Sequence, residues 1–168
     1  MLSEIVAQFA GMPLADQKKI AKISQNATKD MVWVPNPGPQ SNAFFSEADE
    51  LFYGGQAGGG KTDLEIGLAL TAHKRSLILR RTNKEVLGLV ERMSGILGSR
   101  DGFSSQTGMW RRPDGRVVDL GGVQLEEDKQ KFKGVPHDLI CFDEVSDFTA
   151  SQYTFILAWN RSAVPGQR

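Results

Sequence analysis

Apolar residues recur along the chain at two spacings, and their order predicts an alternation of helices and strands. Near the amino end the spacing is helical. It predicts one helix over residues 2–10 and a second, after Gly11 and Pro13, that runs to Ile23. Residues 24–43 are expected to be irregular, because the segment Asn36-Pro37-Gly38-Pro39 opposes regular structure. These segments predict a helical amino-terminal part, residues 1–32, before a larger domain, residues 33–168.

The larger domain shows short apolar runs separated by longer amphipathic stretches. Capping boxes at Thr82 and Thr149 mark two helix starts, and Asp114-Gly115 between apolar pairs predicts a hairpin turn. The expected elements are a buried strand at 50–53, a helix after 61, a strand at 76–80, a helix at 82–98, a hairpin within 107–122, a strand at 138–142 and a helix at 149–159. This order predicts an α/β fold, a mostly parallel sheet flanked by helices, with the hairpin as an insertion.

The composition restricts the class of protein without selecting a function. Twenty Lys and Arg residues balance twenty Asp and Glu residues, so the net charge gives no sign of a free-standing nucleic-acid clamp. One cysteine, Cys141, and two histidines offer neither a disulfide nor a set of zinc ligands. No run approaches the ~20 apolar residues of a membrane helix, and the amino end lacks the basic start of a signal peptide. A cytosolic protein without a membrane partner is expected.

One glycine-rich motif stands between the first expected strand and its helix. It reads Gly55, Gln56, Ala57, Gly58, Gly59, Gly60, Lys61, Thr62, which matches the pattern G-x-x-x-x-G-K-[ST]. In such a loop, successive backbone N–H groups surround a β-phosphate, and the helix start adds its partial positive charge. Lys61 can then reach the β- and γ-phosphates, and the Thr62 hydroxyl can bind Mg²⁺. A glycine linker alone would not explain the Lys-Thr pair between a strand and a helix.

A second motif ends the expected strand at 138–142 with the adjacent carboxylates Asp143 and Glu144. Beside a phosphate loop, Asp143 can hold Mg²⁺ through water, and Glu144 can orient and deprotonate the attacking water. An apolar run followed by Asp-Glu also ends many ordinary strands, so its weight comes from the loop upstream. Together the two motifs predict ATP and Mg²⁺ as ligands, ATP hydrolysis as the reaction, and a P-loop NTPase fold of the RecA or ASCE type.

Gln40 follows a segment made rigid by prolines. A glutamine amide can pair with the N6 and N7 edge of adenine while an aromatic ring covers the base. Chemistry alone leaves a structured linker as an equal alternative.

The combination of these motifs resembles the large terminase subunit of tailed bacteriophages. The likeness extends from about Trp33 to the end of the chain. It is carried by the proline-rich segment with Gln40, by residues 51–62, by Ser76–Thr82, by Lys131-Phe132-Lys133-Gly134 before the strand ending in Asp143-Glu144, and by Phe148-Thr149 and Trp159-Asn160-Arg161-Ser162.

This resemblance implies the ATPase domain of a DNA-packaging motor, which works as a homo-oligomeric ring on the portal protein and drives double-stranded viral DNA into the capsid. It implies the small terminase subunit as a further partner and the host bacterial cytoplasm, with a transient stay on the procapsid, as the location. It also implies an adenine contact for Gln40. The family's coupling motif and nuclease domain do not occur in these 168 residues. We therefore expect a truncated amino-terminal piece with weak turnover in isolation.

Phosphoryl transfer gains from an arginine that neutralises charge, and the loop contains none. Arg80 and Arg81 end an expected core strand, so either can point toward the site, although both can equally solvate the strand end. Lys131 and Lys133 lie where relatives can place a basic residue, but lysine lacks the bidentate fork of arginine. Two other interpretations stay open: a helicase-like or other RecA-type ATPase, and a nucleotide-binding module with little turnover.

Overall fold

The structure, a computed structural model, describes residues 2–56 and 58–161. The chain divides into two compact units, Met1–Val34 and Pro35–Arg168. Its elements in chain order are α1 (Leu2–Gly11), α2 (Leu14–Thr28), α3 (Pro39–Phe44), α4 (Lys61–Thr71), β1 (Arg75–Arg80), α5 (Asn83–Leu97), β2 (Phe103–Ser104), β3 (Met109–Arg111), β4 (Val117–Gly122), η1 (Glu126–Phe132), β5 (Leu139–Phe142), η2 (Val145–Asp147) and α6 (Ala150–Leu157).

The first unit contains the two helices that the apolar spacing predicts. α1 ends at Gly11, and Pro13 precedes the start of α2. The second helix runs to Thr28, five residues beyond Ile23, and α3 begins at Pro39. The prediction of an irregular segment over residues 24–43 is therefore wrong at both ends. Pro39 begins a helix because proline at the first helical position loses no hydrogen bond.

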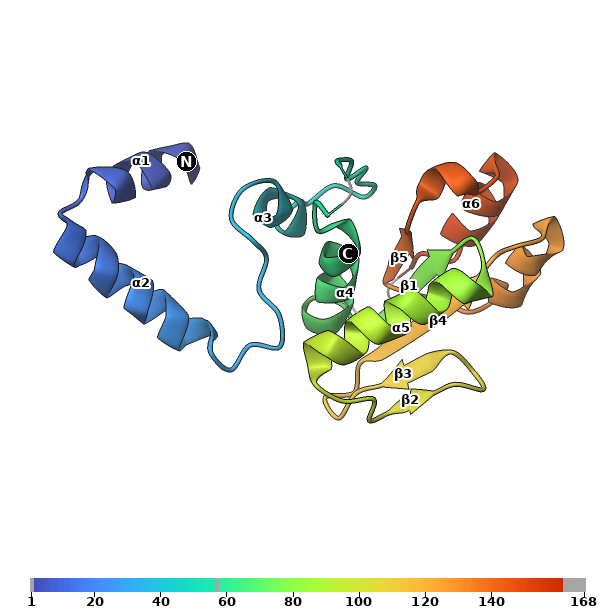
Figure 1. Cartoon of the computed structure of the whole chain (residues 1–168). Helices are drawn as coiled ribbons and strands as arrows, with labels where there is room; N and C mark the ends of the chain where they lie inside the picture. Colours follow the sequence, from blue (N-terminus) through green and yellow to red (C-terminus); the bar gives the residue numbers. More distant parts are fainter. Residues whose placement is uncertain (1, 57, 162–168) are drawn as a thin grey trace. The chain divides into compact units, whose positions relative to one another are not determined.

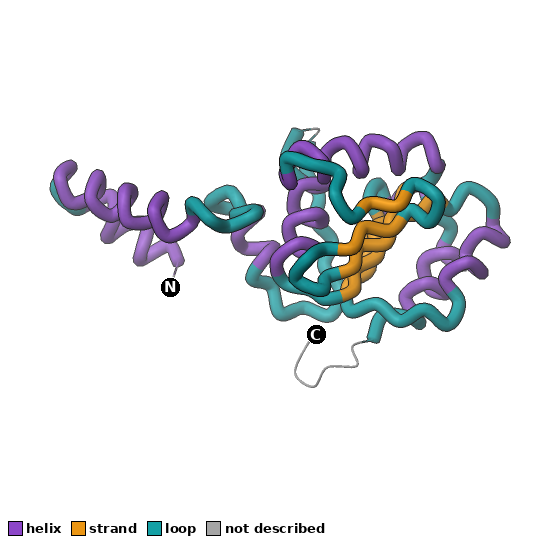
Figure 2. Tube along the Cα trace, turned by 90° about the horizontal axis from the view of Figure 1, so that it is seen from below, coloured by secondary structure: helices purple, strands orange, loops and turns teal. Residues whose placement is uncertain are grey.

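The second unit is built on an open five-stranded sheet in the order β2-β3-β4-β1-β5 (Figures 1 and 2). β1 pairs in parallel with β4 on one side and with β5 on the other. β3 pairs antiparallel with β4 through the turn at Asp114-Gly115, and β2 pairs antiparallel with β3. The α/β class is confirmed, but the sheet is mixed. The expected hairpin is not a peripheral insertion, because its return strand β4 is the central strand of the sheet and pairs in parallel with β1.

Helices cover both faces of this sheet. On one face α4 and α5 pack on strand residues that include Ile78, Val118 and Cys141. On the other face Leu77 and Leu79 pack with Ile156 of α6 and the half-buried Phe132 of η1. Odd and even positions of β1 therefore serve different layers, as the two-residue period of a strand requires. The four inner residues of β1 are buried and the strand has a partner on each side, so its position fixes where the polar residue at its end lies.

Both capping boxes form as the sequence predicts. The Thr82 side chain accepts a hydrogen bond from the Glu85 N–H, and the Glu85 carboxylate accepts one from the Thr82 N–H at 2.8 Å. Thr149 and Gln152 make the same reciprocal pair at the start of α6. Among the described residues, no helix has the length and apolar character needed to cross a membrane.

The strand expected at 50–53 does not form. Residues 51–55 belong to no helix or strand, and Leu51 and Phe52 are exposed at 47% and 71%. The apolar run Leu51-Phe52-Tyr53 is only three residues long and ends at Gly54-Gly55. Such a short run does not by itself fix the register of a strand against a neighbour. In the described part of the chain β5 pairs only with β1, so its other edge has no strand beside it.

Candidate functional site

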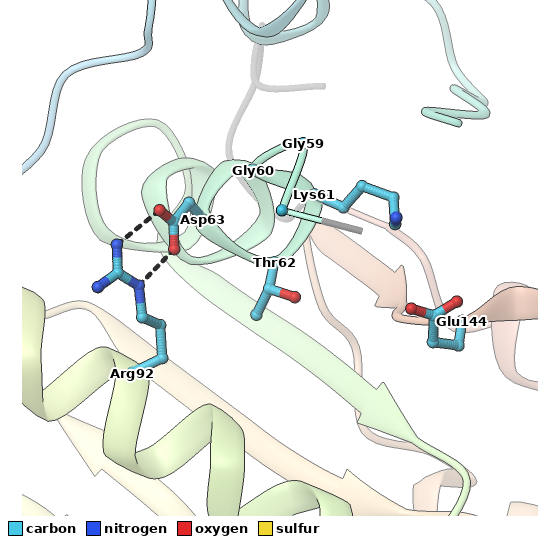
Figure 3. Close-up of a pocket in the computed structure, with 8 residues that line it drawn as sticks. Gly59, Gly60, Lys61, Thr62, Asp63, Arg92 and Glu144 are labelled. Carbon is cyan, nitrogen blue, oxygen red and sulfur yellow. Dashed lines mark hydrogen bonds and ion pairs between the residues drawn. The ribbon is translucent and has the colours of Figure 1, made fainter. Parts of the chain in front are cut away.

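The glycine-rich loop and the end of β5 lie around one cavity. The cavity has a volume of about 330 Å³ and is lined by Gly58, Gly59, Gly60, Lys61, Thr62, Asp63, Arg92 and Glu144 (Figure 3). Its volume falls at the lower end of the range for small-molecule sites. Gly55 and Gln56 adjoin this loop, whereas Ala57 lies outside the described residues. The loop motif and the second carboxylate motif are thus brought together, as expected from their positions along the chain.

Lys61 begins α4 and folds back over the loop. Its Nζ donates hydrogen bonds to the carbonyl oxygens of Gly55 at 3.1 Å and Gln56 at 3.4 Å. Both acceptors are weak neutral groups, which a charged phosphate oxygen would replace at a gain. The Lys61 ammonium therefore lies beside the loop backbone at the cavity, where it can contact an anionic ligand.

Thr62 and Asp143 join the loop to the sheet. The Thr62 hydroxyl donates a hydrogen bond to Asp143 Oδ2 at 2.8 Å, across 81 positions of sequence. Asp143 is almost fully buried and follows directly on β5, where its own N–H donates to the Leu79 carbonyl of β1. Two hard oxygen donors therefore converge at the start of α4.

The next residue, Glu144, is exposed and lines the cavity. Its φ angle is +58°, the only positive value among the described non-glycine residues. A left-handed conformation costs an L-residue about 1–2 kcal/mol, so the local packing must impose it. The turn separates the two carboxylates: Asp143 points into the protein toward Thr62, whereas Glu144 faces the cavity.

Gln40 contacts the loop from the α3 side. Only 4% of the residue is exposed. Its Nε2 donates to the Gly60 carbonyl at 2.9 Å, and its Oε1 accepts the Asn36 N–H at 2.6 Å. Both ends of the amide are thus bound to backbone, and the side chain ties the proline-rich segment to the last glycine of the loop. The adenine contact suggested for Gln40 stays a prediction.

The two arginines at the end of β1 lie in different places. Arg80 reaches the site, with its Nη2 at 2.5 Å from Asp143 Oδ2 and 3.5 Å from the Thr62 hydroxyl. Arg81 turns the other way and donates through Nη1 to the Val123 carbonyl at 3.0 Å and to Gln152 at 2.9 Å. Successive strand residues point to opposite faces, so only one of the two can face the loop. Arg81 therefore takes part in packing α6 on the sheet, away from Thr62 and Asp143, and its catalytic role stays a prediction without a supporting contact.

Three charged residues at the site were missed by sequence reasoning. Arg92 of α5 binds Asp63 in a bidentate pair at 2.5 and 2.6 Å, and both line the cavity. In Figure 3 this pair lies on the other side of the start of α4 from Glu144. Glu65, one turn into α4, has a solvent-shielded Oε2 with no hydrogen-bond partner among the described residues. Burial, reinforced by Asp143, raises the pKa of Glu65 well above its usual value, while Arg80 opposes the shift.

No sequence spacing indicates that Arg92 and Asp63 form a pair. Arg92 lies 29 positions from Asp63 on an exposed helix face, and only the packing of α5 beside α4 makes them neighbours. Glu65 has the sequence context of one more solvated helix residue. Its proximity to Asp143 was in principle detectable, because it follows Thr62 by three positions and thus occupies a similar side of the helix.

The donor set fits Mg²⁺ bound together with a nucleotide. Among the described residues, no group of three or more His, Cys, Asp or Glu side chains is arranged to hold a metal ion by itself. Mg²⁺ in nucleotide sites needs no such cage, since one or two protein oxygens act with phosphates and waters. The Thr62 hydroxyl and the Asp143 carboxylate, hydrogen-bonded at 2.8 Å, supply those oxygens.

Comparison with known proteins does not name a relative. No family model, no curated protein and no solved structure matches this chain. The functional argument therefore depends on the residues and their geometry.

Proposed function

We propose that this chain is an ATP-hydrolysing domain with a P-loop NTPase fold, and that it serves as the motor domain of a phage DNA-packaging terminase. The observation that carries the ATPase part is the hydrogen bond between Thr62 and Asp143, with Lys61 and Glu144 beside it at one cavity. The loop backbone would bind the phosphates, and Lys61 would exchange its two carbonyl partners for phosphate oxygens. The terminase part is supported by the sequence resemblance.

In this proposal each residue has a separate task. Thr62 and Asp143 would hold Mg²⁺, which would neutralise charge that develops on the phosphates during transfer. Glu144 faces the cavity and acts as the general base for the attacking water. Gln40 holds the Gly60 carbonyl and with it the shape of the loop. The adenine contact of Gln40 remains part of the proposal, because a glutamine amide has a second N–H and a second lone pair.

The decisive experiment measures nucleotide binding and steady-state ATP hydrolysis on the same preparations. Lys61→Ala is expected to lose ATP affinity in calorimetry, and Glu144→Gln to bind ATP normally but hydrolyse it at least ~100-fold more slowly. Lys74→Ala is the matched control, because its exposed side chain lies at the opposite end of β1. Equal turnover in Glu144→Gln and the unmodified chain would remove the assignment of the base. Unchanged ATP binding in Lys61→Ala would contradict the assignment of residues 55–62 as a phosphate-binding loop.

The motor part of the proposal has its own test. A packaging ATPase contacts DNA phosphates rather than bases, so double-stranded DNA of any sequence should stimulate hydrolysis, and the effect should fall steeply with salt. Stimulation by single-stranded DNA alone would favour a helicase-like ATPase. In this proposal the assembled motor is a homo-oligomeric ring, with the portal protein and the small terminase subunit as partners. It works in the host bacterial cytoplasm and stays transiently on the procapsid.

A second function, a nucleotide-binding module with little turnover, is favoured by one contact. Arg80 is the arginine that reaches Thr62 and Asp143, and its guanidinium is already paired with Asp143. An arginine held on a metal ligand is not free to stabilise the transferring phosphate. High ATP affinity with no turnover above that of Glu144→Gln would support this alternative.

A further inference from the structure

Arg80 occupies a particular position at the site. Its Nη2 lies 2.5 Å from Asp143 Oδ2, the same oxygen that accepts the Thr62 hydroxyl at 2.8 Å. Both of these oxygens are the proposed Mg²⁺ ligands. The side chain of Asp143 is 1% exposed, so its charge needs a partner inside the protein, and Arg80 supplies it. Without a metal, the guanidinium thus neutralises the carboxylate that the metal would use.

This arrangement leaves two buried polar atoms unsatisfied. The Nε of Arg80 and the Oε2 of Glu65 are both shielded from solvent, and neither has a hydrogen-bond partner among the described residues. Buried polar groups are nearly always paired, so two complementary ones left over at one site need an explanation. Glu65 feels the charges of Arg80 and Asp143. The guanidinium donor and the carboxyl acceptor therefore lie close enough to interact electrostatically, yet neither is hydrogen-bonded to the other.

A second arrangement would satisfy both atoms. Two cations on one carboxylate oxygen repel strongly in a buried place, so Arg80 and Mg²⁺ exclude each other at Asp143 Oδ2. An arginine that leaves Asp143 meets the unpaired carboxylate of Glu65, which can accept a bidentate pair. Arg80 thus has Asp143 as its partner when the site is free of metal, and Glu65 as a possible partner when Mg²⁺ is bound.

We propose that Arg80 is a positioning residue that holds Thr62 and Asp143 together in the nucleotide-free chain and moves to Glu65 when Mg²⁺ and nucleotide bind. The proposal rests on the proposed function, because it concerns the same metal ligands. It goes further by assigning Arg80 to exchange between two carboxylates instead of to the transferring phosphate, and by giving Glu65 a role.

The test is the Mg²⁺ dependence of nucleotide binding, followed with a fluorescent ATP analogue at increasing Mg²⁺ and independent of turnover. Arg80→Gln removes the competing cation, so half-maximal binding should need at least about fivefold less Mg²⁺. Glu65→Gln removes the second partner, so the requirement should rise by at least about fivefold. The double variant Arg80→Gln/Glu65→Gln should need the same Mg²⁺ concentration as Arg80→Gln alone, because without Arg80 there is no guanidinium for Glu65 to bind. Non-additivity of this kind indicates direct coupling.

Thermal unfolding provides a second readout. Arg80→Gln leaves the buried Asp143 without its positive partner, so the metal-free Tm of this variant should fall. Mg²⁺ with nucleotide should raise its Tm more than that of the unmodified chain. Glu65→Gln removes an unpaired acid and should not lower the metal-free Tm. Arg75→Gln is the matched control: Arg75 begins the same strand and pairs with Asp119 at 3.4 Å, away from the site. Its Mg²⁺ requirement should be unchanged.

The outcomes separate this inference from the proposed function. If the unmodified chain binds no nucleotide, or binds it as Lys61→Ala does, both are overturned. If it binds nucleotide with Mg²⁺ but Glu65→Gln has the same requirement, or Arg80→Gln has a higher one, only the exchange of Arg80 is overturned. Opposite shifts in the two single variants, lost in the double variant, support it.

Discussion

At the scale of single residues, two backbone positions set the shape of the site. Gly60 has φ of +74° and directly precedes α4, and a Cβ placed there would lie 2.6 Å from Gln40 Nε2. Glu144 has φ of +58° and turns its carboxylate away from Asp143. Glycine is favoured at the first position both by conformation and by the close approach of Gln40. At the second, the strain is carried by a residue whose side chain faces the cavity, a common feature of functional sites.

Gly60→Ala should therefore damage the loop. The added methyl group must push Gln40 away from the Gly60 carbonyl, and the left-handed backbone becomes unfavourable. We expect a loss of about 1–3 kcal/mol in the free energy of unfolding and weaker ATP binding. Urea unfolding and calorimetry measure the two effects.

The control for Gly60→Ala is Gly88→Ala. Gly88 lies within α5 and has no positive φ, and a methyl group added to it would meet no atom within 4 Å. Alanine there should raise stability by about 0.5–1 kcal/mol. Equal effects of the two substitutions would contradict the special role of Gly60.

His73 predicts how stability depends on pH. Burial lowers the pKa of His73 below its usual 6.5, although Asp138, 3.9 Å away, opposes the shift. The unfolded chain then binds more protons at this position, so stability present above about pH 6.5 is lost as pH falls through the lower pKa of the folded chain. We expect Tm to fall from pH 7.5 to 5, and to fall less in His73→Gln. Parallel curves for the two proteins would exclude this group.

At the scale of elements, β1 carries the most information. Its centre is buried on both faces, and its last residue, Arg80, points away from Arg81, which follows the strand. Arg80 reaches Asp143, whereas Arg81 binds the Val123 carbonyl after β4 and Gln152 of α6. Gln152 is fully buried and also caps α6. At the end of this strand, Arg80 therefore contacts the site on one face of the sheet, and Arg81 helps to pack α6 on the other.

Arg81→Ala should separate these two roles. It leaves the buried Gln152 without its charged donor, which should cost about 1.5–3 kcal/mol in the free energy of unfolding. Because Arg81 contacts neither the loop nor Asp143 in the described structure, ATP affinity should be preserved in a folded sample. Calorimetry and urea unfolding on the same protein provide the check. A large loss of ATP affinity without destabilisation would return Arg81 to the site.

At the scale of the whole molecule, the two compact units differ in content. Every residue of both hydrophobic clusters lies beyond position 65, within Pro35–Arg168. The loop, Gln40, Asp143 and Glu144 also belong to this unit. The net charge of zero leaves any contact with DNA to local surfaces.

A chain that begins at Pro35 should therefore fold and bind ATP as the full chain does. Its core and its site lose no residue, so the cooperative unfolding transition and the ATP affinity should be unchanged. Circular dichroism during heating and calorimetry measure both. A noncooperative transition would show that residues 1–34 contribute to the fold of the second unit.

The sequence by itself determined the elements whose signals are local. Capping boxes at Thr82 and Thr149, the turn at Asp114-Gly115 and the apolar run of β1 are each decided by a few neighbouring residues, and all of them form. These local features depend on backbone hydrogen bonding and side-chain spacing within about ten residues. The two motifs also met as expected, although no strand precedes the loop: Thr62 at the start of α4 binds Asp143 at the end of β5.

Tertiary structure alone decided the rest. Residues 50–53 have a strand's composition but remain unpaired, since a strand forms only against a neighbour. Arg80 and Arg81 lie on opposite faces of the sheet, because successive side chains of a strand alternate. Arg92 binds Asp63 only because α5 packs beside α4. The roles proposed for Arg80 and Glu65 depend on burial and on charges that only the fold brings together. Such contacts have no local signature, because the energy of a buried charge depends on everything packed around it.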